Sequence, residues 1–143
     1  MADQPKDMTV RQIMTTEIDT VLESDSLVTA AKRLALADVG ALPVCDDGKH
    51  LRGIVTDRDL VVQGIAKGKN PETTTVGEIE TRKPVSVTPD STLDETASLM
   101  ASHRIRRIPV VANDKVVGMI SQADVARTGD PELTTHVLRG VSE

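Results

Sequence analysis

Two short motifs in the chain place a hydroxyl and a carboxylate where a strand is expected to give way to a helix. In the first motif, Thr56 is followed three residues later by Asp59, and in the second, Ser121 is followed by Asp124. A glycine and two apolar residues precede each hydroxyl residue. This order predicts a strand, a sharp turn and a helix N-terminus, with both polar side chains gathered at the turn.

Two kinds of chemistry fit this spacing. The hydroxyl can accept a backbone N–H of the first helical turn while the acid reaches back to the cap, which is a capping box. Alternatively, the carboxylate can face a cleft and accept hydrogen bonds from a vicinal diol such as a ribose. Asp57 and Asp59 place negative charge at the first helix start. We therefore expect neutral sugar hydroxyls there rather than the phosphate that bare helix N-termini attract.

The elements that position these motifs occur twice, because the chain contains an internal repeat. Thr9–Val44 aligns with Thr75–Val110 without a gap, and Gly53 then pairs with Gly118 after one residue is lost. Each copy is too small to bury its apolar residues alone, so we expect the two copies to pack against each other.

Each copy predicts the order β-α-β-β-α. The first long helix of each copy is expected to be capped by Ser24 or Asp25, and by Asp90 or Ser91. In the first copy this helix should bury Leu27, Ala30, Ala31 and Leu34, and in the second Leu93, Ala97 and Met100. The expected hairpin strands are Ala41–Cys45 with His50–Val55, and Ile108–Ala112 with Val116–Ile120. The last helices should start at Asp57 and Gln122, and Asp130-Pro131 should begin a final helix.

Composition excludes several classes of function. The chain has 143 residues, a formal net charge of −5 and no Phe, Tyr or Trp. An acidic chain without aromatic stacking platforms does not suit nucleic acid or an anionic membrane. Cys45 is the only cysteine and is expected in the core, and residues 1–8 are polar, unlike a signal peptide. These features predict a cytoplasmic protein without a thiolate metal site.

The repeated motifs resemble those of the CBS-domain family. The segments Gly40-Ala41-Leu42-Pro43-Val44 and Arg106-Arg107-Ile108-Pro109-Val110 are each followed, at a matching distance, by the Gly-x-x-Thr/Ser-x-x-Asp motif. The chain is therefore similar to a tandem CBS pair, or Bateman module, and in layout to small stand-alone bacterial CBS-pair proteins such as the mycobacterial hypoxic response protein type. The resemblance implies a mixed α/β (α+β) fold with two CBS repeats packed as a pseudo-two-fold pair.

Two ligand clefts between the repeats follow from this resemblance, with adenosyl compounds (AMP, ADP, ATP, NAD or S-adenosylmethionine) as ligands. No cofactor is expected to be required. In the family, the Asp of the motif holds the ribose and the residues before the other copy's Pro-Val contact the phosphate. Carried over, the first cleft comprises Ile54, Thr56, Asp57, Asp59, Pro84, Val85, Arg106 and Arg107. The second and weaker cleft comprises Ile18, Asp19, Gly40, Ala41, Met119, Ser121 and Asp124.

The two expected clefts differ in charge. Arg106 and Arg107 give the first a planar, permanently charged partner for phosphate, whereas Gly40 and Ala41 leave the second without one. The arginines have a simpler interpretation as a solvated, dipole-compensating helix end. The histidines His50, His103 and His136 share no metal-ligand spacing, so no metal is expected.

The sequence therefore predicts a ligand-sensing regulatory module, not an enzyme. The alternative is a structural or partner-binding dimer module with degenerate clefts, and catalysis on a nucleotide is a weaker possibility. Surplus apolar residues, Leu36 and Leu60, Val61, Val62 and Ile65, predict a homodimer. The expected domains are a polar tail at 1–8, CBS domain 1 at 9–70, a linker at 71–74, CBS domain 2 at 75–130 and a C-terminal helix at 131–143.

Overall fold

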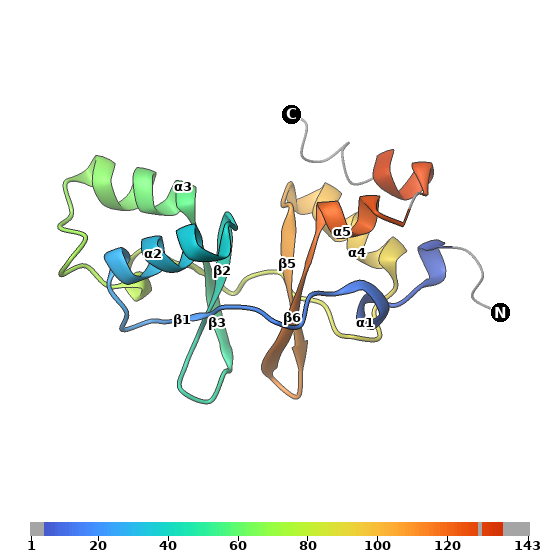
Figure 1. The fold of residues 1–143 in the computed structure, drawn as a ribbon, viewed down its shortest axis with the longest axis horizontal. Coiled ribbons are helices and arrows are strands. Elements are labelled where there is room, and N and C mark those ends of the chain that lie inside the picture. Colours follow the sequence, from blue (N-terminus) through green and yellow to red (C-terminus); the bar gives the residue numbers. More distant parts are fainter. Residues whose placement is uncertain (1–4, 129, 136–143) are drawn as a thin grey trace. The chain divides into compact units, whose positions relative to one another are not determined.

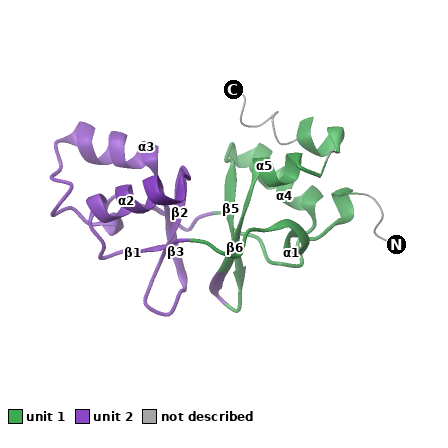
Figure 2. Cartoon of the chain, viewed as in Figure 1, with its two compact units in different colours: residues 1–18, 85–113, 117–143 green, residues 19–84, 114–116 purple. Residues whose placement is uncertain are grey.

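The chain forms two compact units, each combining helices with a small sheet (Figures 1 and 2). The computed structural model describes residues 5–128 and 130–135. Unit 1 comprises Met1–Ile18, Val85–Asn113 and Val117–Glu143, and unit 2 comprises Asp19–Pro84 and Asp114–Val116. The units do not follow the sequence repeats, because the opening segment of each repeat belongs to the unit that holds the body of the other (Figure 2).

Unit 2 contains a four-stranded sheet in the order β1-β2-β3-β4. β1 (Val21–Leu22) runs parallel to β2 (Ala41–Cys45), which pairs with β3 (Leu51–Thr56) as an antiparallel hairpin. β4 (Thr81–Arg82) pairs antiparallel with the other edge of β3. All five residues of β2 are buried, as expected of a central apolar strand.

Helices cover this sheet in unit 2. α2 (Leu27–Ala37) buries Leu27, Ala30 and Leu34 at helical spacing, while Ala31 is exposed, so its predicted burial was wrong. The predicted last helix starts at Asp57 and continues as α3 (Asp57–Asp59), a π-helical turn (Leu60–Gly64) and a 3-10 turn (Ile65–Lys67). A further 3-10 turn (Val76–Glu78) precedes β4. The core gathers Val21, Leu27, Ala30, Leu34, Leu42, Val44, Val55, Val76 and Ile79.

Unit 1 repeats this sheet pattern around the hairpin of β5 (Arg107–Ala112) and β6 (Lys115–Ser121), although Lys115 and Val116 group with unit 2. Val87 bridges Val110 in parallel on one side, and Thr15 bridges Met119 antiparallel on the other. These bridges occupy the places of β1 and β4, since Val87 aligns with Val21 and Thr15 with Thr81. The opening segment of each repeat therefore lies at the sheet edge of the other repeat's hairpin.

The helices of unit 1 are a 3-10 turn (Pro5–Asp7), α1 (Val10–Ile13), α4 (Leu93–His103) and α5 (Gln122–Ala126). Residues 131–135 are helical, and Asp130 accepts the backbone N–H of Glu132, as expected for its cap; the rest of the predicted C-terminal helix lies outside the described residues. The core gathers Val10, Val87, Leu93, Ala97, Met100, Ile108, Val110, Ile120, Val125 and Leu133.

The predicted caps of the two long helices were wrong by one or two residues. α2 is capped by Ser26, which accepts the N–H of Thr29, and α4 by Thr92, which accepts the N–H of Glu95. Asp25 instead accepts the N–H of Leu22, and Ser91 accepts that of Thr88. Asp25 and Ser91 therefore stabilise the turn that leads into each helix, because each side chain accepts a backbone N–H three residues before it.

Candidate functional site

The first motif forms the expected cap and leaves part of its carboxylate unused. Thr56, the last residue of β3, accepts the N–H of Asp59 through its hydroxyl at 3.0 Å. Asp59 returns a bond through Oδ2, which accepts the N–H of Thr56 at 2.9 Å. Both residues are half-buried. No hydrogen bond to Asp59 Oδ1 is found among residues 5–128 and 130–135, so this oxygen can accept a ligand hydroxyl.

The second motif forms the same cap but uses its carboxylate fully. Ser121 accepts the N–H of Asp124 at 3.1 Å, and Asp124 Oδ2 accepts the N–H of Ser121 at 2.8 Å. Its remaining oxygen, Oδ1, is paired with the guanidinium of Arg127, one helical turn further on. Asp124 is also buried, with an exposed side-chain fraction of 6%. The residue aligned with Arg127 in the first repeat is Val62, which has no charge to offer.

In each unit, the residues before the Pro-Val strand lie beside that unit's own motif. The N–H of Asp57 donates to the carbonyl of Gly40 at 3.0 Å, and Ala41 pairs with Thr56 across the hairpin. Likewise, the N–H of Gln122 donates to the carbonyl of Arg106 at 2.7 Å. The structure thus brings Gly40 and Ala41 to Thr56 in unit 2, although the sequence prediction assigned them to different clefts.

Unit 1 contains a pocket of about 330 Å³ at this junction. Two of its lining residues are the predicted phosphate partners, the exposed Arg106 and the half-buried Arg107. Ser121, which the sequence prediction assigned to the second cleft, lines the same pocket. Four lining residues were missed by the sequence prediction: Gln122, Ala123, Ala126 and Thr134. Gln122 and Ala123 could have been found, because they are the variable positions of the Ser-x-x-Asp motif, whereas no sequence signal marks Ala126 or Thr134.

The predicted site residues divide between the two units. Unit 2 holds Asp19, Gly40, Ala41, Ile54, Thr56, Asp57, Asp59 and Pro84. Unit 1 holds Ile18, Val85, Arg106, Arg107, Met119, Ser121 and Asp124. Each predicted cleft draws residues from both units, so its assembly stays a prediction. Within the units, Ile54 and Met119 occupy equivalent half-buried positions on β3 and β6.

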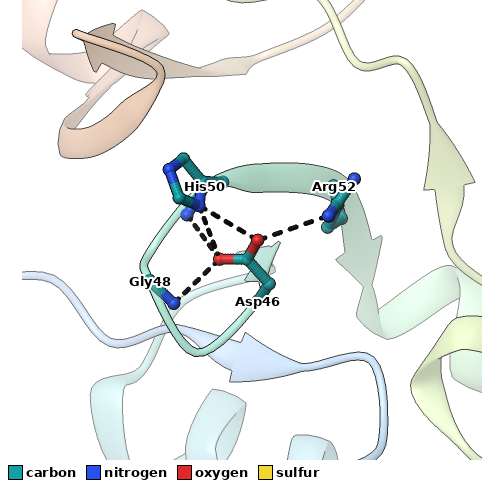
Figure 3. A network of polar contacts seen from close by, with 4 residues as sticks. All are labelled: Asp46, Gly48, His50 and Arg52. Atoms are coloured by element: carbon teal, nitrogen blue, oxygen red, sulfur yellow. Dashed lines mark hydrogen bonds and ion pairs between the residues drawn. The ribbon is translucent and has the colours of Figure 1, made fainter.

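A polar network outside the predicted site fixes the turn between β2 and β3 (Figure 3). Asp46 Oδ1 accepts the N–H groups of Gly48 and His50, both at 2.9 Å, and lies 3.0 Å from His50 Nδ1. Arg52 donates to Oδ2 at 3.3 Å. The hydrogen bond from the His50 backbone is the main cause that lowers the pKa of Asp46. Every contact of this network lies within the hairpin, so the network stabilises the turn. His50 therefore has a structural role in this turn.

Metal ligation, membrane insertion and thiol chemistry each need a particular arrangement of residues. Over residues 5–128 and 130–135, no three His, Cys, Asp or Glu side chains come together in a group able to hold a metal ion. Within the same residues, no helix has the length and apolar character needed to span a membrane. Cys45 is buried, as predicted, and desolvation is the main cause that raises the pKa of its thiol to about 11. A buried thiol with this pKa is not a nucleophile at neutral pH.

Comparisons with known proteins agree with the repeat and the fold. The CBS domain family matches the chain twice, at residues 10–63 and 76–129. Hypoxic response protein 1 of Mycobacterium tuberculosis is 38% identical over 119 residues, which cover 83% of each chain. A crystal structure of that protein with two coordinated zinc ions has a TM-score of 0.79 and covers 84% of this chain and 98% of its own.

Two further structures contain adenosyl compounds. CBSX2 in complex with AMP is 30% identical, with a TM-score of 0.74, and covers 85% of this chain and 95% of its own. The CBS pair of protein MJ0100, in complex with 5-methylthioadenosine and S-adenosyl-L-methionine, is 29% identical, with a TM-score of 0.77 and coverage of 85% and 95%. With two matched domains, the shared strand–turn–helix motifs and these relatives, the chain belongs to the CBS-domain family and carries two CBS domains in tandem.

Proposed function

We propose that this protein is a non-enzymatic, ligand-sensing CBS pair that binds an adenosyl nucleotide of the AMP, ADP, ATP or NAD class. In this proposal the ribose hydroxyls donate to Asp59, and Arg106 and Arg107 bind the phosphate. Ile54, Thr56, Asp57, Pro84 and Val85 complete the first site. The second site, built from Ile18, Asp19, Gly40, Ala41, Met119, Ser121 and Asp124, binds more weakly.

The observation that carries the proposal is the state of the Asp59 carboxylate. One oxygen completes the cap, which fixes the orientation of the side chain, and no hydrogen bond to the other is found among the described residues. A half-buried carboxylate oxygen held in this way is a preorganised acceptor for a hydroxyl pair, and hydrogen bonds to a charged group are stronger than neutral ones. Asp124 is less suited to this role because Arg127 already pairs with it.

The phosphate part of the proposal is supported by the pocket that Arg106 and Arg107 line. A guanidinium matches a phosphate as a planar fork and stays charged at any working pH. Relatives support the adenosyl part of the ligand, since CBSX2 is described in complex with AMP and the MJ0100 pair with 5-methylthioadenosine and S-adenosyl-L-methionine.

Calorimetry and thermal unfolding with AMP, ADP, ATP, NAD and S-adenosylmethionine test the proposal. At a ligand concentration 100-fold above the dissociation constant, the folded state should gain about 2.7 kcal/mol, which raises the melting temperature by several degrees. The double variant Arg106→Ala/Arg107→Ala should lose affinity for the nucleotide, whereas the affinity for adenosine, which has no phosphate, should be the same for the variant and the wild type. Arg11→Ala, an exposed arginine of the same unit, is the matched control. Flat traces with every ligand at millimolar concentration would contradict the proposal.

A dimer-forming role is favoured by a separate observation. In unit 2, Leu36, Val61, Val62 and Ile65 have exposed fractions of 88%, 59%, 37% and 56%. An apolar groove of about 400 Å³ lies between α2 and the helix that follows β3, lined by Leu27, Val28, Ala31, Lys32, Ala35, Leu60, Ile65 and Pro71. Leu60 is only half-buried and packs against the core. Exposed apolar residues and an apolar groove on these two helices suit a second copy of the chain.

We propose a homodimer on this face, with or without nucleotide. Light scattering at micromolar concentration should give twice the chain mass of 15.3 kDa. Val61→Glu should lower the mass to that of a monomer, whereas Lys32→Glu at the rim should have a smaller effect. A dimer with flat calorimetric traces would favour the structural, partner-binding alternative. A wild-type monomer would instead contradict the dimer and leave the nucleotide proposal standing.

A further inference from the structure

Glu80, the residue before β4, has a fully buried side chain. Its exposed fraction is 0%, and Oε1 and Oε2 form no hydrogen bond of ordinary geometry with any residue in 5–128 or 130–135. The carboxyl lies against the backbone of Gly53 on β3, because a Cβ placed on that glycine would be 2.9 Å from Oε2. The missing side chain of Gly53 therefore creates the slot that Glu80 fills.

Three charged residues act on Glu80 from the surrounding elements. Glu23 follows β1, and its carbonyl accepts the N–H of Gly77 at 2.9 Å, which holds it beside the turn that leads to Glu80. Arg82 on β4 has Nε 4.0 Å from Oε1, but its side chain is 71% exposed. Arg52 on β3 is paired with Asp46 at 3.3 Å. The pKa of Glu80 is raised to about 7, mainly by burial and also by the neighbouring Glu23 carboxyl, while the two arginines oppose this rise only in part.

The equivalent slot in unit 1 is filled by an apolar side chain. Gly118 aligns with Gly53, and a Cβ there would lie 3.0 Å from the sulfur of Met14, the residue aligned with Glu80. Pro89 aligns with Glu23. The same backbone slot thus accepts an apolar thioether in one unit and a carboxyl in the other. A carboxyl suits such a slot in its neutral form, since a buried charge without a close partner is costly.

Glu80 also lies next to a strand that is held by very few pairings. β4 has two residues and pairs with β3 only through Gly53 opposite Arg82 and Ile54 opposite Thr81. An ionised Glu80 would put a second negative charge beside Glu23 inside the slot. We propose that Glu80 is a proton-operated switch: when neutral it fills the slot on Gly53 and keeps β4 on the edge of β3, and when ionised it leaves the slot and releases β4.

The direction of the pH dependence follows from this arrangement. The pKa of Glu80 in the folded chain, about 7, lies above the ordinary value of 4.5. The folded state therefore binds the proton more tightly than the unfolded state. The stabilisation from neutral Glu80 is fully present below pH 4.5, decreases as the pH rises and is lost above about pH 7. The switch does not depend on nucleotide binding. Two residues of the proposed first site lie next to it, since Ile54 pairs with β4 and Pro84 follows β4 in the chain.

Thermal unfolding and hydrogen exchange between pH 5 and pH 8.5 test the switch. Glu80→Met copies the residue of the other repeat, and Glu80→Gln keeps the shape without the charge. Between these pH values, the unfolding equilibrium constant of the wild-type chain should rise by at least about tenfold relative to either variant, the effect of one pKa unit. The exposed Glu72→Gln is the matched control and should follow the wild type.

The local readouts are specific to Glu80. A carboxyl ¹³C titration should place its midpoint near pH 7. The protection of the amides of residues 53, 54, 81 and 82, relative to their intrinsic exchange rates at each pH, should fall at high pH in the wild type but not in Glu80→Met. A midpoint below pH 5, or identical pH profiles for the wild type and Glu80→Met, would overturn the proposal. Should Glu80→Gln fail to fold, Glu80→Met and the wild-type titration still decide the question.

Discussion

The two units build one backbone turn but leave its carboxylate in different chemical states. In unit 2, Asp59 completes a cap with one oxygen, and no bond to the other is found among the described residues. In unit 1, Asp124 completes the same cap and pairs its second oxygen with Arg127. The cap explains why both copies have an acid at this position. The residue one helical turn further on, Val62 or Arg127, decides whether the second oxygen of that acid is paired.

A second difference concerns the glycine on the strand before the turn. Gly53 and Gly118 both let another segment approach closely, since the carbonyls of Thr81 and Thr15 lie 2.7 Å and 2.8 Å from where a Cβ would stand. The side chain in the resulting slot is Glu80 in unit 2 and Met14 in unit 1. The repeats therefore share the glycine that allows the close approach of a second segment. They differ in the charge of the side chain that fills the slot.

The largest expected effect comes from the equivalent core leucines, Leu27 and Leu93. Leu93 is fully buried in unit 1, so Leu93→Ala should destabilise the protein by about 3–5 kcal/mol. Leu27 lines the open groove of unit 2, so Leu27→Ala should cost less, about 2–3 kcal/mol, because the site can relax. Urea unfolding measures both free energies. Equal losses would show that the groove is closed in solution, for example by a second copy.

The two strand glycines should give the next largest effect. Gly53→Ala and Gly118→Ala each place a Cβ under 3.0 Å from a backbone carbonyl, and overpacking of this kind costs about 1–3 kcal/mol. Gly53→Ala should cost more at low pH, because the neutral Glu80 carboxyl then occupies the slot that the new Cβ would crowd. Thermal unfolding of both variants at pH 5.5 and pH 8 makes this comparison. Two variants with wild-type stability would contradict the close approach at both sites.

The two capping acids should have similar effects on stability and different effects on binding. Asp59→Ala and Asp124→Ala each remove a cap, which costs about 0.5–2 kcal/mol. Loss of the Arg127 pair adds no more than about 1 kcal/mol for Asp124→Ala, because that arginine is 69% exposed. Calorimetry should show that Asp59→Ala abolishes nucleotide binding and Asp124→Ala largely preserves it. Equal losses of affinity would contradict the asymmetry of the two sites.

Arg127→Val sharpens the same comparison by copying the residue of the first repeat. Removal of the guanidinium leaves Asp124 Oδ1 without its partner, so this acid should become an acceptor comparable to Asp59. We expect the second, weaker nucleotide site to gain affinity in calorimetric titrations. Val62→Arg is the reciprocal variant and should weaken the first site. If neither variant changes the number or strength of the sites, the residue after the cap does not control ligand binding.

The smallest effect is expected at Cys45, which aligns with Val111 of the second repeat. Cys45→Val adds one methyl-sized group but copies the residue that the second repeat holds at this position, so it should change stability by less than about 1.5 kcal/mol. Burial raises the pKa of the thiol to about 11, so the native protein should react slowly with an alkylating reagent at pH 7.5 and quickly once unfolded. Mass spectrometry after timed alkylation measures both rates. Rapid labelling of the folded protein would show that the strand opens.

The sequence alone determined the features that depend on neighbours within a few residues. The repeat, the two hairpins and the capping boxes at Thr56 and Ser121 were all predicted, because strand alternation, turn chemistry and caps act locally. The pairing of Asp124 with Arg127 also lies within one helical turn and could have been read from the spacing. The predicted helix caps at Asp25 and Ser91 were wrong because polar residues of the same kind are used in the preceding turn and at the helix start. Both side chains bond the turn instead.

Only the tertiary structure decided which distant segments meet. The opening segment of each repeat joins the unit of the other, which brings Glu80 to Gly53 and Met14 to Gly118. The carbonyl of Arg106 accepts the N–H of Gln122, which places Arg106 and Arg107 beside Ser121. No local pattern distinguishes a solvated glutamate from one buried in a slot. The burial of Glu80 depends on Gly53 in another strand. Long-range packing, rather than the residue type, therefore sets the pKa of Glu80.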